Sequence, residues 1–273
     1  MTSADTTKAV ILARGLGTRM RKEDETAHLG AEQAAAAGIG LKAMIPIGRP
    51  FLDYVLSALA DAGLTDVCLV IGPEHQQVRD YYEREISPQR ISLRFAIQQE
   101  PLGTANAVLS AEGFAGNDPF IVLNSDNFYP AGALRALHSI TEPAIVGFDR
   151  ETLARLGNVP AERITRFGAL DIDADGYLRR ILGKPTEQML ASGDPIYSSM
   201  NCFLFSRKIF QACRAVPRSA RNEYELPQAV HLAIDHGLMR FKVIKIAAPV
   251  LDLSTRADIA KVAERLKGAE VKL

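Results

Sequence analysis

Residues 8–20 read KAVILARGLGTRM, and this stretch indicates the fold of the whole chain. Its apolar run from Ala9 to Ala13 is typical of a strand buried on both faces of a parallel sheet. Glycines follow at positions 15 and 17. Two glycines this close let the backbone turn sharply and aim successive N–H groups into one concavity, as phosphate-binding loops do. We therefore predict an anion site at the carboxyl end of the first strand.

The two commonest phosphate-binding loops do not match this stretch. A P-loop has a lysine directly after its last glycine, whereas Thr18 follows Gly17 here. A dinucleotide-binding loop has a third glycine at the position of Met20. A glycine-rich turn without a ligand is the alternative that these residues alone leave open.

The loop instead resembles the signature of the sugar-1-phosphate nucleotidyltransferases of the glucose-1-phosphate thymidylyltransferase and uridylyltransferase type. The residues that carry this match are Leu12, Ala13, Gly15, Gly17, Thr18, Arg19 and Met20. The resemblance implies that the loop binds the nucleotide and that Arg19 is catalytic, because it binds the β- and γ-phosphates. Arg14 departs from the pattern, since the family has glycine or alanine there. The nucleotide preference therefore stays open.

The composition is that of an ordinary globular protein, with 273 residues of which 47% are hydrophobic and 23% charged. Lysine and arginine together number 32, as do aspartate and glutamate, so the charge gives no reason to expect a nucleic acid or an anionic membrane as partner. Three cysteines without a CxxC pair argue against a disulfide framework and a thiolate zinc site. Residues 1–7 contain no apolar leader, and no apolar run long enough to cross a membrane follows. We therefore expect a cytoplasmic protein.

Short apolar strands alternate with amphipathic helices along the first half of the chain. Strand patterns follow the first strand at 66–72, 91–97 and 119–123, and helix patterns occur at 50–62, 74–84 and 105–110. Such alternation predicts an α/β fold with a mainly parallel central sheet, helices on both faces and a ligand crevice at the carboxyl ends of the strands. The resemblance implies that this is the Rossmann-like, three-layer α/β/α nucleotidyltransferase fold.

We expect a single domain over residues 1–273. The parts that we expect within it are a nucleotide-binding half at 8–140, a sugar-binding half at 141–253 and a C-terminal helix at 254–273. In the second half, the patterns at 164–172 and 177–181 predict paired strands around a turn at 173–176.

Two further segments resemble family signatures of the nucleotide-binding half. Lys42 stands before an Ile-Pro-Ile segment as the family's catalytic lysine does, after a segment at 20–41 that is longer than in the family. That longer segment would be either a mobile flap near the triphosphate or a solvated surface helix. The second signature contains Gln98, Gly103 and Thr104, whose counterparts in the family bind the nucleotide. An amide such as that of Gln98 offers both a donor and an acceptor to a base edge.

Two aspartates follow apolar strand patterns and are our candidates for metal ligands. Asp126 follows residues 119–123, and Asp252 follows residues 249–251 ahead of Ser254 at a predicted helix start. A carboxylate at the carboxyl end of a parallel strand lies in the ligand crevice, where a Mg²⁺ ligand is expected. The resemblance implies that both aspartates hold Mg²⁺. Capping of a following helix is the structural alternative for each.

The sugar-binding half offers further candidates, all of them implied by the resemblance. Lys184 matches the lysine that holds the sugar phosphate, although Gly183 replaces the glutamate that contacts sugar hydroxyls in relatives. Asn201 matches a strand asparagine that packs against the sugar ring, and Glu223 begins a segment that matches a helix start. The identity of the sugar therefore stays open.

The resemblance implies a Mg²⁺-dependent transferase that joins a nucleoside triphosphate to a sugar 1-phosphate and releases pyrophosphate. In this hypothesis Lys42 neutralises charge on the α-phosphate and Lys184 positions the attacking phosphate. Open alternatives are a cytidylyltransferase acting on another phosphate acceptor such as phosphocholine, and a catalytically silent regulatory relative. A glycosyltransferase with its Asp-x-Asp pattern at 171–175 is the least favoured. The base, the sugar and the oligomeric state, a homo-oligomer included, are not determined by the sequence.

Overall fold

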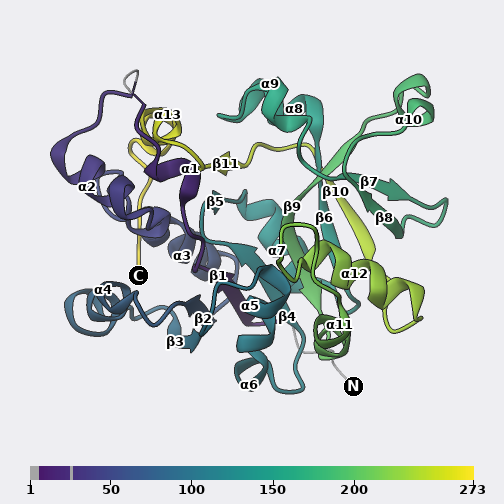
Figure 1. Ribbon diagram of the computed structural model, residues 1–273, viewed down its shortest axis with the longest axis horizontal. Coiled ribbons are helices and arrows are strands. Elements are labelled where there is room, and N and C mark those ends of the chain that lie inside the picture. The colour runs from purple at the N-terminus through teal and green to yellow at the C-terminus, as the bar shows by residue number, and fades with distance from the viewer. Residues whose placement is uncertain (1–5, 25–26) are drawn as a thin grey trace.

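Strand β1 (Lys8–Leu12) lies inside the central sheet, with a parallel neighbour on each side (Figure 1). The computed structural model describes residues 6–24 and 27–273. Its main sheet has the strand order β10-β6-β9-β4-β1-β2-β3. The other strands in this order are β2 (Asp66–Ile71), β3 (Ser92–Ile97), β4 (Phe120–Asn124), β6 (Ala144–Asp149), β9 (Tyr197–Phe205) and β10 (Lys242–Ile246).

Strand β9 runs antiparallel to β4 and β6, and the other pairings along this order are parallel. The expected mainly parallel sheet is therefore confirmed. The parallel strands β1 and β4 are in register from Lys8 opposite Phe120 to Leu12 opposite Asn124, so both strands end at the same edge of the sheet. This edge is where a doubly wound fold forms its ligand crevice.

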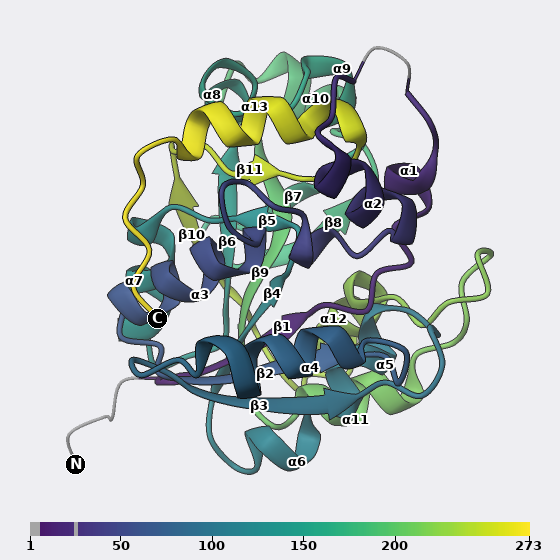
Figure 2. The same ribbon diagram turned by 90° about the vertical axis from the view of Figure 1, so that its left-hand side faces the viewer.

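Helices cover both faces of the sheet, as two separate apolar clusters show (Figure 2). Ala9 and Ile11 of β1 belong to one cluster, whereas Val10 and Leu12 belong to the other, because side chains alternate along a strand. The first cluster contains residues of α2 (Ala31–Ile39), α3 (Phe51–Asp61), α7 (Ala131–Ser139) and α13 (Arg256–Leu266). The second contains residues of α5 (Thr104–Ser110), α6 (Glu112–Ala115), α11 (Ile209–Ala215) and α12 (Leu226–Asp235). The three-layer architecture is thus confirmed.

A hairpin of β7 (Ala169–Ile172) and β8 (Leu178–Leu182) extends the sheet beside β9. The expected turn at 173–176 is present, because Asp173 N–H donates to the carbonyl of Tyr177 over 2.8 Å. The strand that we expected over 164–172 begins later. Its first residue, Ile164, ends α9 (Ala161–Ile164), since Pro160 precedes a helical turn whose Ile164 packs into the core, and residues 165–168 are neither helix nor strand.

Two helix predictions also needed correction at their ends. The pattern at 74–84 forms α4 (Gln76–Asp80), which continues as the π-helix η2 (Tyr81–Ile86). The C-terminal helix expected over 254–273 is α13, which ends at Leu266 ahead of Gly268 with φ +78°. The chain after it lies against α3, where Lys272 N–H donates to Ser57 Oγ over 3.0 Å.

The remaining elements are short and connect these layers. They are α1 (Thr18–Arg21), η1 (Lys42–Met44), β5 (Asn127–Phe128), α8 (Arg150–Leu156), α10 (Glu187–Ala191) and β11 (Leu251–Asp252). Among the residues that the structure describes, no helix combines the length and the apolar character that a membrane span requires.

Candidate active site

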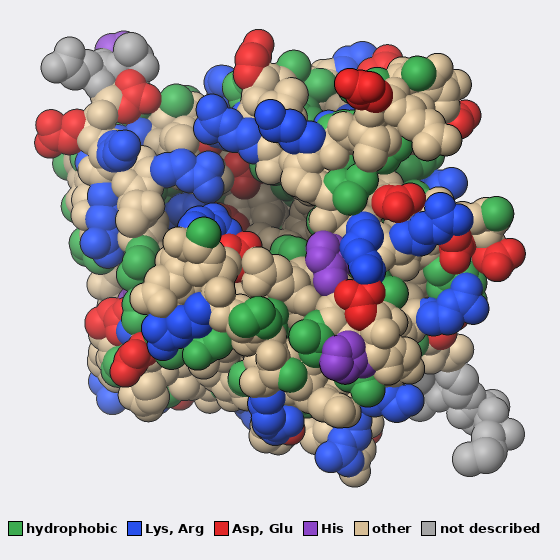
Figure 3. All heavy atoms as spheres, turned by 45° about the vertical axis from the view of Figure 1, so that its right-hand side comes forward, with side chains coloured by type: hydrophobic (Ala, Val, Ile, Leu, Met, Phe, Trp, Pro, Cys, Tyr) green, Lys and Arg blue, Asp and Glu red, His purple; other side chains and the backbone are tan. Residues whose placement is uncertain are grey.

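A cavity of about 350 Å³ opens at the carboxyl ends of β1 and β4. Figure 3 shows it as a hollow with lysine and arginine side chains along part of its rim. The residues that we predicted for the site and that line this cavity are Leu12, Ala13, Gly15, Gly17, Thr18, Arg19, Lys42, Gln98, Gly103, Thr104, Asp126, Asn201 and Glu223. Segments far apart in sequence therefore meet at one place, as the carboxyl ends of parallel strands should.

The glycine loop closes by packing against the end of the segment that precedes Lys42. Gly17 has φ +61°, and a Cβ placed on it would lie 2.1 Å from the main-chain oxygen of Gly40. Arg21 Nε donates to the carbonyl of Ile39 over 3.0 Å. Within segment 20–41, helix α2 is thus docked on the loop, with Ala37 buried, and residues 25 and 26 lie outside the described ranges. Whether this segment moves as a flap stays a prediction.

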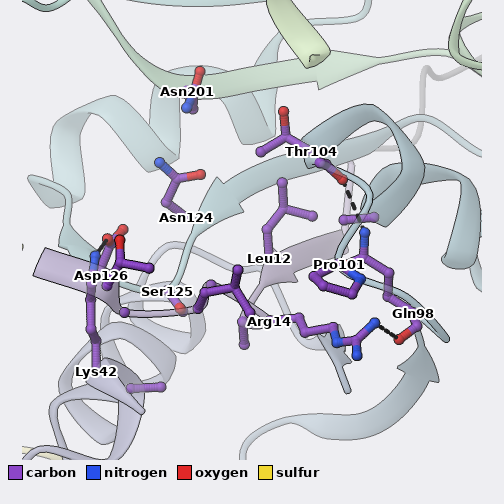
Figure 4. Close-up of a pocket in the computed structure, with 18 of the residues that line it drawn as sticks. Leu12, Arg14, Lys42, Gln98, Pro101, Thr104, Asn124, Ser125, Asp126 and Asn201 are labelled. Carbon is purple, nitrogen blue, oxygen red and sulfur yellow. Dashed lines mark hydrogen bonds and ion pairs between the residues drawn. The ribbon is translucent and has the colours of Figure 1, made fainter. Parts of the chain in front are cut away.

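Lys42 and Asp126 form an ion pair inside the cavity. Lys42 Nζ lies 2.6 Å from Asp126 Oδ2, and both side chains are mostly buried (Figure 4). No helix begins after Asp126, since β5 follows at once, so helix capping does not explain this carboxylate. The pair places one cation and one anion where the first and fourth strands end.

Asp252 is brought next to Asp126 by a small antiparallel sheet. In this sheet β5 pairs with β11, so that Asp252 lies opposite Asn127, and Leu253 N–H donates to the carbonyl of Asp126 over 2.8 Å. Capping of α13 does not explain Asp252 either, because Thr255 and Asp258 form that capping box.

The Asp252 carboxylate is buried and does not line the cavity. Its Oδ1 accepts hydrogen bonds from Asn127 Nδ2 over 2.9 Å and from Ser254 Oγ over 3.1 Å. Its Oδ2 makes no hydrogen bond and lies 3.1 Å from Arg163 Nη2 in an ion pair. Burial, followed by the charge of Asp126, raises the pKa of Asp252 to about 6, and Arg163 acts in the opposite direction.

The two aspartates form a donor set that suits Mg²⁺ shared with a substrate. Within the described ranges, no group of three or more His, Cys, Asp or Glu side chains is arranged to hold a metal. Mg²⁺ is usually bound through one or two carboxylates together with substrate phosphates and water, rather than by a cage of protein ligands. The buried Oδ2 of Asp252, which accepts no hydrogen bond, and the cavity-facing Asp126 fit that kind of site.

The opposite end of the cavity combines apolar side chains with an amide and an arginine. Figure 4 shows Leu12 between the Lys42–Asp126 pair and an end formed by Arg14, Gln98 and Pro101. Gln98 is almost fully buried, and its Nε2 donates to the Gly103 carbonyl over 3.0 Å. A cavity end that combines the apolar side chains of Leu12 and Pro101 with a fixed amide is suited to a nucleobase.

Gly103 and Thr104 connect the two halves of the chain. A Cβ placed on Gly103, which has φ +101°, would lie 2.6 Å from the carbonyl oxygen of Tyr224. Thr104 Oγ1 accepts a hydrogen bond from Leu226 N–H over 2.9 Å at the start of α12. These contacts hold Glu223, which directly precedes Tyr224, at the cavity wall.

Asn201 points into the cavity from an irregular part of β9. The pairing of β9 with β6 shifts register between Ile145 and Gly147, and Asn201 has φ +54° there. Tyr129, which is fully buried, donates its hydroxyl to the carbonyl of Met200 over 2.6 Å. The carbonyl next to this bulge is therefore satisfied, and the bulge turns Asn201 toward the ligand space.

We expect Asn201→Ala to lower the free energy of unfolding by about 1 kcal/mol, because a Cβ without a polar group is disfavoured in the left-handed region. Asn201→Gly should stay close to the wild type in stability, since glycine accepts this conformation. Urea denaturation of the three proteins measures the difference. Equal stability of the alanine variant and the wild type would contradict the backbone argument.

Lys184 is, like Asp252, a predicted site residue that does not line the cavity. It is exposed in the connection between β8 and α10, and it is not a cavity-lining residue. Its assignment to the sugar phosphate stays a prediction. The Asp-x-Asp pattern at 171–175 lies in the β7–β8 hairpin and contributes nothing to the cavity, so the glycosyltransferase alternative loses its basis.

Several residues that matter here were not predicted from the sequence. Arg163 was not singled out, although it pairs with Asp252. Tyr129 supports the bulge of β9 without lying near it in sequence. Asn124 and Ser125 line the cavity, and their position at the strand end before Asp126 was a usable signal.

The fold and the cavity define an α/β protein with a ligand crevice at the carboxyl ends of its parallel strands, and the comparisons identify its family. The chain belongs to the nucleotidyl transferase family, whose sequence profile matches residues 37–267. Strand β1 and the glycine loop precede the matched range.

Similar proteins include sugar-nucleotide enzymes. A glucose-1-phosphate thymidylyltransferase of Streptomyces antibioticus is 29% identical over 84% of this chain, and the chain spans 58% of that protein's length. The UTP–glucose-1-phosphate uridylyltransferase AglF of Haloferax volcanii is 27% identical over 95% of this chain and 96% of its own. A UDP-glucose pyrophosphorylase solved with UDP-glucose has a TM-score of 0.72 at 16% identity, covering 97% of this chain and all of that one, which shows the shared fold.

Proposed function

We propose that this protein joins a nucleoside triphosphate and a sugar 1-phosphate to give a nucleoside diphosphate sugar and pyrophosphate. The observation that carries the proposal is the two-ended cavity at the carboxyl ends of β1 and β4. One end holds the glycine loop, Arg19 and the Lys42–Asp126 pair, and the other holds an amide between apolar walls. The names of the two similar enzymes described above state reactions of this kind.

In the proposed reaction a phosphate oxygen of the sugar phosphate attacks the α-phosphorus of the triphosphate. The new P–O bond forms as the bond to the β-phosphate breaks, and pyrophosphate leaves. Such transfer depends on in-line positioning and on neutralising charge, so no protein nucleophile is required. The loop amides and Arg19 would bind the β- and γ-phosphates. Lys42 would break its ion pair with Asp126 and neutralise charge on the α-phosphate.

We further propose that Asp126 and Asp252 hold Mg²⁺ with the triphosphate. The bound cation would neutralise charge on the phosphate oxygens and fix their orientation. Gln98, Gly103 and Thr104 would shape the base end, and Asn201 and Glu223 would face the sugar. Lys184 would approach the attacking phosphate from the exposed segment between β8 and α10.

The test is pyrophosphate release with Mg²⁺, in which each common nucleoside triphosphate is combined with a panel of sugar 1-phosphates and with phosphocholine. Release that requires one sugar 1-phosphate supports the proposal, and release only with phosphocholine supports the cytidylyltransferase alternative. The ion pair of Arg163 with Asp252 favours a second candidate, a silent binding relative. That candidate predicts no release with any pair, although a triphosphate still raises the melting temperature.

We expect removal of divalent cations with EDTA to lower the release of pyrophosphate at least about a hundredfold, because the charge on the triphosphate is then not neutralised. Excess Mg²⁺ should restore it. Circular dichroism in EDTA should match that of the untreated protein, since the fold is held by the two apolar clusters. Full activity in EDTA would contradict the assignment of Mg²⁺.

A further inference from the structure

Arg14 occupies the position at which this chain departs from its family's loop signature, and its side chain is almost fully enclosed. Only 7% of that side chain is exposed. Its guanidinium forms a fork with the carboxylate of Glu74, with Nε to Oε1 and Nη2 to Oε2 both at 3.2 Å. Its Nη1 donates to the main-chain carbonyl of Gln98. The loop and the end of β3 are therefore tied together by one side chain (Figure 4).

Every polar group of Gln98 except its side-chain oxygen makes a hydrogen bond. Its N–H donates to the Ile71 carbonyl over 2.9 Å, and its carbonyl accepts from Arg14. Its Nε2 donates to the Gly103 carbonyl and, over 2.9 Å, to Asn106 Oδ1. A main-chain carbonyl can only accept, so the amide nitrogen must face Gly103 and the amide orientation is determined. The side-chain oxygen Oε1 accepts no hydrogen bond from a described residue, and it is not fully enclosed by protein.

We propose that Arg14 is a positioning residue for nucleobase selection, acting through Gln98, and that Glu74 keeps Arg14 in this role. This inference rests on the proposed function, because it treats the Gln98 end of the cavity as the base end. With its peptide fixed by Arg14, Gln98 presents Oε1 as an acceptor in one orientation, which favours a base edge that carries a ring N–H. Without Arg14, the main-chain carbonyl of Gln98 loses a charged partner and the amide gains freedom.

Glu74 also explains how a cation is accommodated in a phosphate-binding loop. An unpaired arginine beside the glycines would attract the triphosphate away from Arg19 and Lys42. The fork with Glu74 directs the guanidinium toward the end of β3 instead. Burial raises the pKa of Glu74, but a backbone hydrogen bond and then the hydrogen bond and charge of Arg14 lower it below its ordinary value, so this carboxylate stays ionised beside Arg14.

The experiment measures binding and turnover for Arg14→Ala, Glu74→Gln and the double variant. We expect the affinity for UMP in Arg14→Ala to fall about tenfold, the usual effect of losing a charged hydrogen bond. The affinity for inorganic pyrophosphate should stay within about twofold, because pyrophosphate uses only the phosphate end. In turnover, KM for the triphosphate should rise with little change in kcat, and the preference among UTP, dTTP and CTP should weaken.

The double variant separates a coupled pair from two independent contacts. If Glu74 acts only through Arg14, adding Glu74→Gln to Arg14→Ala should weaken UMP binding no further. Arg14→Lys serves as a second variant, since it keeps the charge but cannot form the fork, and it should bind UMP with intermediate affinity. Arg214→Ala is the matched control, because Arg214 pairs with Glu112 on the surface between α11 and α6 and does not line the cavity.

Unchanged UMP affinity and base preference in Arg14→Ala would overturn the inference. Equal losses of UMP and pyrophosphate affinity would also overturn it, since they would indicate general damage to the loop. Failure of the proposed function is distinguishable from both outcomes. In that case the wild type releases no pyrophosphate with any acceptor, while calorimetry with UMP and pyrophosphate still decides the role of Arg14.

Discussion

Asp126→Asn is expected to lower pyrophosphate release about a thousandfold, the order of magnitude found when a key electrostatic group is removed from an active site. The substitution keeps the shape of the side chain and removes its charge. The neutral amide is a poor ligand for Mg²⁺ and no longer pairs with Lys42, whose Nζ lies 2.6 Å from Asp126 Oδ2. Initial rates at saturating substrate, with the melting temperature measured in parallel, test this expectation.

The fold should tolerate this change, because Lys42 and Asp126 both line the open cavity, where water can solvate the Lys42 ammonium once the carboxylate charge is gone. We therefore expect the melting temperature of Asp126→Asn to stay within a few degrees of the wild type. Asp118→Asn is the matched control, since Asp118 is an exposed carboxylate that pairs with Lys8 over 2.7 Å away from the cavity. It should retain wild-type turnover. Full turnover in Asp126→Asn would rule out the metal assignment, whatever the control shows.

Local sequence patterns were enough to predict the central sheet and the edge of the sheet at which the cavity lies. The apolar run before Gly15 indicated a buried strand, and β1 pairs with parallel strands on both sides. Once β1 and β4 are parallel, geometry brings the glycine loop and Asp126 to one edge, because both follow strand ends there. The convergence of Lys42 and Gln98 on the same cavity follows from the same rule together with the family resemblance.

The pairing of charged side chains could not be predicted in this way. Asp252 and Arg163 are far apart in sequence, and nothing near either residue indicates that the other is its partner. The same holds for Arg14 and Glu74, which come from different strand ends. The periodicity of apolar residues along the sequence predicts which face of a helix or strand is buried. It does not predict which charged side chains meet at the edge of a sheet.

Conformations that depend on tertiary contacts were also missed. The β-bulge at Asn201 needs the hydroxyl of Tyr129 to satisfy a carbonyl beside it, and β9 otherwise looks like a regular apolar strand. The false strand start at Ile164 has a related cause. The pattern at 164–172 predicted a strand from residue 164 on, whereas burial of one helical turn after Pro160 decided the structure there.

Gly17→Ala is expected to destabilise the protein by at least about 2 kcal/mol, since a left-handed alanine and a main-chain collision both have to be relieved. A Cβ at this position would lie 2.1 Å from the carbonyl oxygen of Gly40, which is main chain and cannot rotate away. The loop and the end of α2 must therefore separate. Because the loop amides then no longer point at the phosphates, turnover should fall about a hundredfold, as it does when reacting groups are misplaced by about 1 Å.

Two further glycines on the docked segment make this prediction specific. Gly40→Ala should act in the same direction, because Gly40 has φ +78° and its Cβ would lie 2.9 Å from the Leu16 carbonyl oxygen. Gly38→Ala should leave turnover unchanged and raise stability by up to about 1 kcal/mol, since this helical site is open and alanine favours helix. Urea denaturation and pyrophosphate release distinguish the three variants. A Gly17→Ala protein as stable and active as Gly38→Ala would show that contact between the loop and α2 is not needed, and the docked segment would then be a passive surface helix.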